Sequence, residues 1–445
     1  MTEVGIDAVE IWTGKLKLDL PETFAPAKGE DPGKYTKGLG LEASSFPDTY
    51  EDIVTMAANA AKQLMDRKNL SPGDIGRIDV ATESAFDHSK PVSTYVAGCL
   101  DSVYEGDFTH ANKGERKFAC VAGTQAVDDA YNWIKAGRNR GKAGLVIATD
   151  TALYARGDPG EATQGAGAVA MLIDEDPALT ALSTNQGFGS KDETDFLKPN
   201  QQFPSVDGKR SVQVYLSRMR EAWEDLESAA GRILPGDFEF SPFHTPFPGM
   251  VRKAAPFAYR RLVRGSSVED DLAGRIGRQP READYDDRDN YEEAISAYMD
   301  DLTELDEYSQ WYSGAIEPTL DIARRVGNWY TGSVHLARAS ALRHAARTDT
   351  DMVGQELLIA SYGSGAQAEI HSETVREGWK QEIESLNLDA QLERRYDLSY
   401  EEYENVHDVH DYDKDTELDA FTQPDGEFVF TGWGRMSERT YEYAG

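Results

Sequence analysis

Apolar residues recur along this chain at two spacings, and each spacing predicts a kind of element. In residues 50–70, Ile53, Met56, Ala60 and Leu64 fall on one face at helical spacing, which predicts an amphipathic helix. Two more helices are predicted at residues 93–100 and 117–137. Short, nearly continuous apolar runs predict buried strands at residues 4–12, 75–84, 143–150 and 165–174. Helices that alternate with buried strands indicate an α/β fold.

The second half of the chain repeats part of this order. The first half places a helix and then a strand in residues 120–150. Residues 328–365 again predict a helix of small residues, entered through a Gly-rich loop, and then a strand that ends in a glycine loop. We therefore expect two similar α/β halves, residues 1–175 and 176–445, whose glycine loops face one site.

Two stretches interrupt the periodic pattern. Residues 266–294 and 397–419 are rich in charge and poor in apolar side chains. A segment of this composition buries little surface, so we predict that both are exposed excursions from the fold.

The charge of the chain changes the picture further. The formal net charge is −33 and the pI is near 4.6. Such a charge repels nucleic-acid phosphates, so we expect no nucleic-acid partner. The acidic residues are spread along the chain, which is typical of proteins from extreme halophiles, although an ordinary acidic cytosolic protein is the alternative. We favour a halophile because self-repulsion of this size destabilises a compact fold in dilute buffer.

Nothing in the sequence predicts a membrane or secretory destination. No run of about eighteen apolar residues is present. The first residues, "MTEVGIDAVEIW", lack a basic segment followed by a long apolar one, so we expect no secretory signal. Two cysteines do not make a disulfide framework. We expect a reducing, cytoplasmic setting.

One of the two cysteines begins a predicted helix, in "KFACVAGTQAVDDAYNWIKAG". The unpaired N–H groups of a helix N-terminus lower the pKa of a thiol and can hold an oxyanion. The small residues Ala122, Gly123 and Thr124 leave room for a thioester beside Cys120. Cys120 is therefore a candidate nucleophile for acyl transfer. A buried structural cysteine is the alternative.

Two further side chains fit such chemistry. His244 lies in a Pro-interrupted loop, with Arg252 and Lys253 close behind it. Glu83 follows a predicted buried strand, at the end where the sites of α/β sheets lie. A nucleophile, an imidazole and a carboxylate at the ends of three elements make a plausible catalytic set.

A series of motifs runs nearly from end to end of the chain. They are "GKYTKGLG" (33–40), "IGRIDVATES" (75–84), "ACVAGTQAV" (119–127), "VDGKRSVQVYL" (206–216), "FHTPF" (243–247), "GNWYTGSV" (327–334) and "SYGSG" (361–365). The chain resembles the hydroxymethylglutaryl-CoA synthases, a family of thiolase-like condensing enzymes, in the residues of these motifs, in their order and in their spacing.

This resemblance implies a thiolase-like five-layered α-β-α-β-α sandwich of two similar halves, usually dimeric. It implies that acetyl-CoA and acetoacetyl-CoA combine with water to give 3-hydroxy-3-methylglutaryl-CoA and free CoA, in the mevalonate route to isoprenoids. Coenzyme A thioesters are then the substrates, and no cofactor is expected.

The resemblance also implies roles for single residues. Cys120 carries the acetyl group, Glu83 is the general acid/base, and His244 binds the acetoacetyl group and polarises its ketone. Four residues are expected to contact the acyl-CoA: Thr163, Ser211, Asn328 and Ser364. Lys253 is expected to lie near the CoA. The chain departs from the family at Gly249, where a second lysine is often found, so the contacts to the CoA phosphates are open.

Two alternatives stay open. A thiolase or ketoacyl synthase is the nearest one, but a thiolase normally supplies a second cysteine as base. Cys99 lies inside a predicted helix without a glycine loop, and we interpret it as a packing residue.

A metal site is the other alternative. The stretch "HDVHDYDKD", residues 407–415, has aspartates at the spacing of the start of a calcium loop, but Thr416 and Thr422 stand where that loop requires glycine and glutamate. We interpret the stretch as a solvated acidic face and expect no metal.

Overall fold

The computed structural model describes residues 2–199, 201–231, 233, 236–409 and 418–445. In this part of the chain, eight strands form one hydrogen-bonded series in the order β11-β12-β8-β1-β7-β6-β4-β5. Their bounds in that order are Glu356–Gly363, Gln367–Val375, Thr180–Ser190, Val4–Thr13, Gly165–Glu175, Ala143–Ala152, Ile75–Ala81 and Asn112–Arg116. The strands predicted near residues 4, 75, 143, 165 and 356 are confirmed.

The series consists of two similar sheets that touch at one corner. β1 pairs with β8 only through Gly5 and Ile6, and a Cβ at Gly5 would lie 2.0 Å from the carbonyl oxygen of Thr180. In the first sheet, β6 pairs with β4 in parallel and with β7 antiparallel. In the second, β11 pairs in parallel with the segment around Phe240 and Phe243, and antiparallel with β12. The repeat of this pattern confirms two similar halves.

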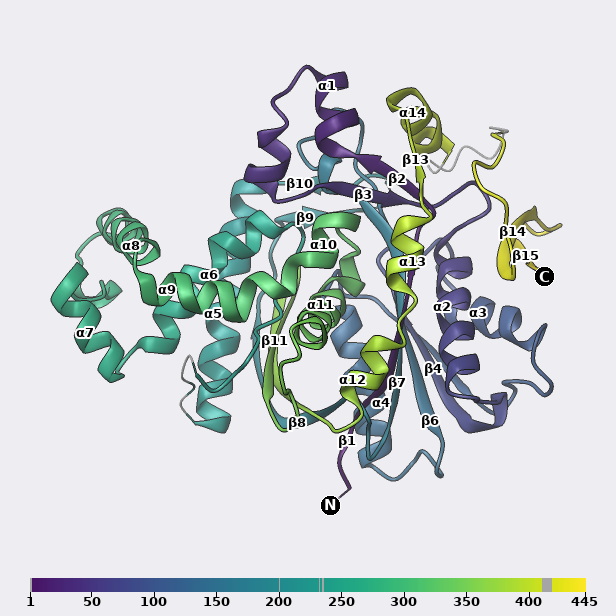
Figure 1. Ribbon diagram of the computed structural model, residues 1–445, viewed down its shortest axis with the longest axis horizontal. Coiled ribbons are helices and arrows are strands. Elements are labelled where there is room, and N and C mark those ends of the chain that lie inside the picture. Colours follow the sequence, from purple (N-terminus) through teal and green to yellow (C-terminus); the bar gives the residue numbers. More distant parts are fainter. Residues whose placement is uncertain (1, 200, 232, 234–235, 410–417) are drawn as a thin grey trace.

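Helices fill three layers around the two sheets (Figure 1). Buried residues form one cluster outside the first sheet, one between the sheets and one outside the second. The helices of these layers are α2 (Ile53–Arg67) and α3 (Val92–Asp101), then α4 (Ala122–Lys135) and α11 (Ser333–Arg347), then α5 (Gly208–Ala230), α6 (Pro248–Val263) and α8 (Arg288–Thr303). The predicted five-layered sandwich is confirmed.

Local chemistry sets where these helices begin. The Asp52 carboxylate accepts hydrogen bonds from the backbone N–H groups of Val54 and Thr55, and the Thr55 hydroxyl accepts one from the Asp52 N–H. This reciprocal cap satisfies donors that the first turn of α2 leaves unpaired. From Ile53 to Ala61 every residue of α2 is buried, because the first sheet lies on one side and α3 and the C-terminal segment cover others.

Within the described residues, both predicted excursions are mostly exposed or half-buried, as expected, but each also contains a helix. Residues 266–294 include α7 (Ser267–Ile276) and the start of α8, and α7 buries Leu272 in the cluster outside the second sheet. Residues 397–419 include α14 (Tyr400–Val409), which buries Tyr403. Most of the stability of a helix in a protein comes from packing, and these helices pack through few buried side chains.

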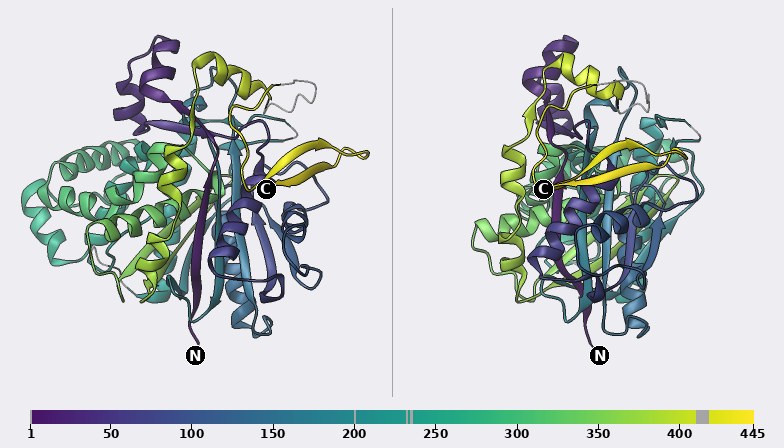
Figure 2. Two further views of the ribbon diagram at one scale, coloured as in Figure 1. Left: turned by 45° about the vertical axis from the view of Figure 1, so that its right-hand side comes forward. Right: turned by 90° about the vertical axis from the view of Figure 1, so that its right-hand side faces the viewer.

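The C-terminal residues return to the first half of the chain. β13 (Tyr396–Asp397) pairs in parallel with β2 (Leu16–Asp19), which also pairs with β3 (Ala43–Phe46). The hairpin of β14 (Glu427–Trp433) and β15 (Arg439–Ala444) projects from the body (Figure 2), while Phe428 at its base is buried beside α2.

The remaining α-helices and strands are short. They are α1 (Ala25–Lys28), β9 (Phe196–Leu197), β10 (Ser205–Val206), α9 (Asp306–Trp311), α10 (Asp321–Val326), α12 (Trp379–Glu384) and α13 (Leu388–Glu393). Among the helices of the described ranges, none has the length and apolar character needed to cross a bilayer.

Candidate active site

Glu83 lies in the loop directly after β4, and a buried carboxylate holds this loop in place. Asp150 on β6 accepts hydrogen bonds from the Thr82 hydroxyl (3.0 Å), the Glu83 backbone N–H (2.9 Å) and the Ser84 hydroxyl (2.8 Å). It also accepts from the backbone N–H of Thr331, which belongs to the second half (3.0 Å). Asp150 thus fixes the backbone of Glu83 and ties the two halves together. The sequence analysis did not single it out.

Cys120 meets the Glu83 side chain. The Sγ of Cys120 lies 3.0 Å from Oε1 of Glu83, with the thiol as donor. Cys120 precedes α4, and Ala119 before it adopts a φ of 44°, a tight left-handed turn. Gly363, at the end of β11, closes the other side, because a Cβ there would lie 2.6 Å from the Phe118 carbonyl oxygen. The two halves of the chain therefore meet at this cysteine.

Burial shifts the pKa values of both groups upward. Desolvation, and then the charge and hydrogen bond of Glu83, raise the pKa of the Cys120 thiol well above its ordinary value. This is opposite to the lowering expected from a helix N-terminus, since burial next to a carboxylate outweighs the helix dipole. Burial, and then the charge of Asp150, raise the pKa of Glu83 to about 8. Glu83 can therefore take up or release a proton close to neutral pH.

His244 is buried and its backbone is held by β11. Its N–H donates to the Ala360 carbonyl (2.8 Å), and its own carbonyl accepts from the Tyr215 hydroxyl (3.3 Å). Burial lowers the pKa of His244 to about 3, so the ring is neutral at ordinary pH. Within the described chain, its Nδ1 has no hydrogen-bond partner. A neutral imidazole with a free nitrogen can hydrogen-bond a substrate oxygen.

Tyr362 on β11 links His244 to the cysteine. Its ring centroid lies 6.2 Å from that of His244. Burial, and then the charges of Asp195 and Cys120 among other causes, raise the pKa of its hydroxyl. Tyr362 was missed, although its position before the glycine loop of "SYGSG" could have indicated it.

Ser211 and Ser364 are brought together by a buried aspartate. Asp195 accepts hydrogen bonds from the Ser211 hydroxyl (3.3 Å), the Tyr362 hydroxyl (3.1 Å) and the Gly365 N–H (3.1 Å). Ser364 also interacts with the Tyr362 hydroxyl. The two serines predicted to contact the acyl-CoA therefore lie at the same end of β11 as His244 and Cys120. Asp195 could not be singled out from the sequence, because the chain has 79 acidic residues.

Thr163 and Asn328 are also neighbours. The N–H of Asn328 donates to the Thr163 carbonyl (3.0 Å), and the Asn328 Oδ1 accepts from the N–H of Tyr330 (2.9 Å). Tyr330 has a φ of 40° and is fully buried, and its hydroxyl lies within the electrostatic reach of Glu83 and Cys120. The hydroxyl of Thr163 donates to Gly160 and so serves its own turn.

Lys253 is set apart from this cluster. It is exposed on α6 and lines a cavity whose described lining contains none of Glu83, Cys120 and His244. Arg252, predicted to help it, donates to the Lys37 carbonyl (2.7 Å).

The position of the missing family lysine has a steric explanation. A Cβ at Gly249 would lie 2.4 Å from the Gly38 carbonyl oxygen. α6 packs directly on the backbone of residues 34–39, so no side chain fits at this position.

Two other sequence interpretations can be compared with the structure. Cys99 is buried in α3, and burial raises its pKa to about 12, which fits a packing residue. Residues 410–417 of the acidic stretch lie outside the described residues. His407 does not belong to a solvated face: it is buried, and its Nε2 lies 2.8 Å from the Tyr154 carbonyl.

Comparisons with known proteins agree over the whole chain. The family model described as Hydroxymethylglutaryl-coenzyme A synthase N terminal matches residues 1–178, and its C-terminal counterpart matches residues 187–430. The hydroxymethylglutaryl-CoA synthase of Haloferax volcanii is 72% identical over 443 residues, with 100% of both chains covered. That of Enterococcus faecalis is 30% identical, with 90% of each chain covered. The halophile origin expected from the charge fits the first relative.

Solved structures give the same result. MvaS in complex with 3-hydroxy-3-methylglutaryl coenzyme A has a TM-score of 0.83 at 31% identity, and the match covers 100% of both chains. An HMG-CoA synthase complexed with CoA has a TM-score of 0.76 at 28% identity, covering 99% of this chain and 100% of that one. The chain therefore belongs to the hydroxymethylglutaryl-CoA synthase family.

Proposed function

We propose that the chain condenses acetyl-CoA with acetoacetyl-CoA and water to 3-hydroxy-3-methylglutaryl-CoA and free CoA, the reaction of its family in the mevalonate route. The observation that carries the mechanism is the 3.0 Å contact between Cys120 Sγ and Glu83 Oε1. It places a nucleophile and a proton acceptor at one point, at the junction of the two halves.

The first step loads the acetyl group onto Cys120. The thiolate attacks the acetyl-CoA carbonyl, the CoA sulfur leaves with a proton, and a Cys120 thioester remains. Gly363 lets the end of β11 approach the backbone beside the cysteine, because a Cβ there would lie 2.6 Å from the Phe118 carbonyl oxygen.

Carbon–carbon bond formation follows on the loaded enzyme. Glu83 removes a proton from the acetyl methyl, and the resulting carbon nucleophile adds to the ketone of acetoacetyl-CoA. His244 is neutral and has a free ring nitrogen, so it can polarise that ketone and hydrogen-bond the alkoxide that forms. Water then hydrolyses the Cys120 thioester, which releases the product carboxylate and restores the thiol.

The substrates are CoA thioesters, and the proposed reaction needs no cofactor or metal. Ser211, Ser364, Thr163 and Asn328 are the proposed contacts for the acyl-CoA, supported by their positions around the end of β11 and beside Tyr330. Lys253 is proposed as a contact for the CoA on the exposed face of α6.

The thiolase alternative has weaker support. A thiolase needs a second cysteine as base, and Cys99 is buried in α3 away from any glycine loop. No observation favours Cys99 as a base.

We also propose that two copies of the chain form a dimer in the cytoplasm. β5 is an edge strand, paired with β4 on one side only, and its residues are exposed or half-buried. Such an edge can pair with another copy. Size-exclusion chromatography with light scattering measures the mass directly, and a monomer at micromolar concentration contradicts the proposal.

Mass spectrometry of the intact protein tests the proposed function. Brief exposure to acetyl-CoA should add one acetyl group, mapped to the peptide with Cys120. Cys120→Ser should lose both adduct and activity, while the matched variant Cys99→Ser should keep both. A Cys120→Ala protein that is still active would contradict the proposal.

A further inference from the structure

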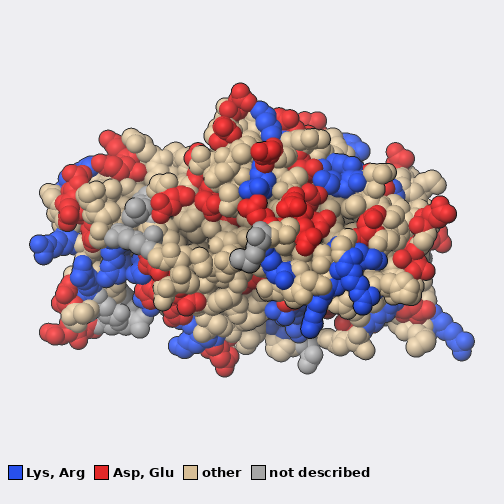
Figure 3. Space-filling view, turned by 90° about the horizontal axis from the view of Figure 1, so that it is seen from below, with Lys and Arg blue, Asp and Glu red and all other residues tan. Residues whose placement is uncertain are grey.

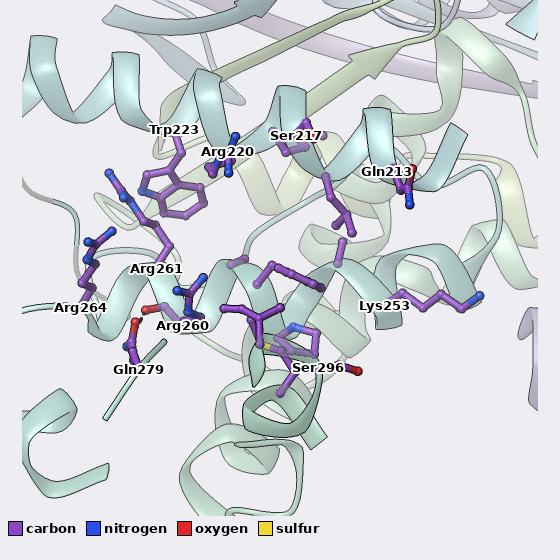
Figure 4. Close-up of a pocket in the computed structure, with 18 of the residues that line it drawn as sticks. Gln213, Ser217, Arg220, Trp223, Lys253, Arg260, Arg261, Arg264, Gln279 and Ser296 are labelled. Atoms are coloured by element: carbon purple, nitrogen blue, oxygen red, sulfur yellow. Dashed lines mark hydrogen bonds between the residues drawn. The ribbon is translucent and has the colours of Figure 1, made fainter. Parts of the chain in front are cut away.

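A cavity lies on the outer side of the molecule, between α5, α6 and α8 (Figure 4). Its volume is about 840 Å³, which is within the range of small-molecule sites. Its described lining includes Lys253, the proposed contact for the CoA, but none of Glu83, Cys120, His244, Thr163, Ser211, Asn328 and Ser364. The proposed condensation therefore gives a role to one lysine of this cavity and none to its five arginines.

The charge of its lining is the reverse of that of the chain. The whole sequence has 46 basic and 79 acidic residues. The described lining has six basic side chains and two acidic ones: Arg220, Lys253, Arg260, Arg261, Arg264 and Arg281, against Glu224 and Asp300. In so acidic a chain, this concentration of arginines produces a local positive potential that favours an anion.

Several of these arginines have no carboxylate partner. Arg261 forms ion pairs with Glu224 and Glu227. Among the residues that the structure describes, Arg220, Arg264 and Arg281 form no salt bridge, so their guanidinium groups are available to a ligand. Figure 4 shows Arg260, Arg261 and Arg264 with Trp223 at one end of the cavity and Lys253 at the other.

Two buried donors in the lining also lack acceptors. Trp223 is 3% exposed, and its indole N–H has no partner in the described chain. The Nε of Arg260 is buried without a partner, although its Nη2 donates to the Pro280 carbonyl (2.7 Å). A buried donor without an acceptor is costly. A ligand rich in acceptor oxygens would satisfy both.

The middle of the cavity is apolar. Leu216, Phe243 and Met299 line it between the arginine end and Lys253. A bare inorganic anion would leave this surface in contact with water, whereas an ester with an apolar body would cover it.

We propose that the arginine end of this cavity is a binding site for a phosphate ester with an apolar body, apart from Glu83, Cys120 and His244. The phosphate group is bound by Arg220, Arg260 and Arg264 with the Trp223 indole N–H, and the body lies along Leu216 and Met299. Bidentate hydrogen bonds from arginine to phosphate supply the specificity. The proposal does not rest on the condensation chemistry.

Calorimetric titration of the full chain in concentrated KCl tests the site. The probes are octyl phosphate, adenosine 5′-monophosphate and inorganic phosphate, so that an aliphatic body, a nucleoside body and no body are compared. We expect one saturable site per chain for at least one ester and weaker binding of inorganic phosphate. Equal binding of inorganic phosphate, or no binding of any probe, would overturn the proposal.

Paired variants locate the binding. Arg220→Gln with Arg264→Gln should weaken the ester by about tenfold or more, because two charge-assisted contacts are lost. Arg278→Gln, an exposed arginine outside the lining, is the matched control and should bind as the wild type does. Retained acetylation of Cys120 shows that the double variant is folded. If the double variant binds the ester with unchanged affinity, the ester binds elsewhere and the site is refuted. Displacement of the ester by saturating CoA would refute the site too.

Discussion

Cys120 and Glu83 determine each other's protonation. Each is half-buried, and the negative charge of Glu83 is one of the causes that raise the pKa of the thiol. The pKa of Glu83 is itself raised to about 8, first by burial and then by Asp150. A carboxyl group poised there is a base strong enough to act on a weak carbon acid.

Glu83→Ala should separate the two half-reactions. Acetylation of Cys120 should persist, because the substitution removes two of the causes that raise the thiol pKa. Condensation should fail, with a loss of about 10²–10⁴-fold in the overall rate. Intact mass and product formation measure the two steps. Near wild-type condensation, or a folded variant that no longer acetylates, would show that the role assigned to Glu83 is wrong.

The pH profile provides a control for this variant. A base acts in its ionised form, so the wild-type condensation rate should rise with pH through about 8, as Glu83 loses its proton. In Glu83→Gln the residual rate should lack this rise. If the rate of Glu83→Gln still rises with pH through about 8, the rise belongs to another titratable group.

Lys253→Ala should raise the Michaelis constants for CoA substrates, with less effect on turnover. The side chain is exposed on α6 and makes no ion pair among the described residues, so it is free to contact an anion. Steady-state kinetics at several KCl concentrations measure both constants. Lys380→Ala, on α12, removes a lysine paired with Asp349 and is the control. Constants that match the wild type at every salt concentration would refute the role.

At the level of elements, the sequence predicted those with one clear apolar face. α2 and α4 were predicted from their spacing, and β6 and β7 from continuous apolar runs. β5, "NKGER", was missed because an edge strand is polar on both faces. β8 was missed too. Gly187 and Gly189 interrupt its apolar pattern so that α5 can lie directly on the strand, and a Cβ at Gly187 would lie 2.0 Å from the Ala222 carbonyl oxygen.

The candidate site was predictable only in part. Residue chemistry alone selected Cys120, Glu83 and His244 as candidates, and the resemblance to a family supplied their roles. Asp150 and Asp195 could not be found, because their importance lies in contacts between segments far apart in sequence. An acidic residue carries little information by itself in a chain of this composition.

Gly249→Ala should destabilise the start of α6. The added Cβ would lie 2.4 Å from the Gly38 carbonyl oxygen, so one backbone segment must move, at a cost of about 1–3 kcal/mol. Gly274→Ala in α7 is the matched control, because nothing lies within 4 Å of its Cβ and alanine favours a helix by roughly 1 kcal/mol. Denaturant unfolding in concentrated KCl compares them. If Gly249→Ala is as stable as the control, the close packing is not a constraint.

At the scale of the whole molecule, repulsion between surface charges is the main feature that the sequence composition sets. Acidic and basic side chains are interspersed over the face seen in Figure 3, and neither sign is confined to one region of it. With a net charge of −33, repulsion acts across the entire surface rather than at one patch.

Lowering the salt concentration should therefore unfold or inactivate the protein. At 1 M salt the Debye length is about 3 Å, which removes most repulsion between surface charges. Circular dichroism and activity during dilution of KCl measure the effect, and NaCl of equal ionic strength should protect equally if screening is the cause. Full activity with a high melting temperature in dilute buffer would contradict this prediction.

The return of the C-terminal residues to the first half has a consequence for synthesis on the ribosome. Gln391 on α13 donates to the Ile11 carbonyl, a partner 380 residues earlier, and β13 supplies a neighbour for β2. At about 5–20 residues per second, β2 emerges roughly 20–80 s before β13 is translated. The nascent first half must wait for that time with one strand edge and the place of Phe428 uncovered. Translation of residues 391–428, rather than of the first half, is then the step that completes the N-terminal fold.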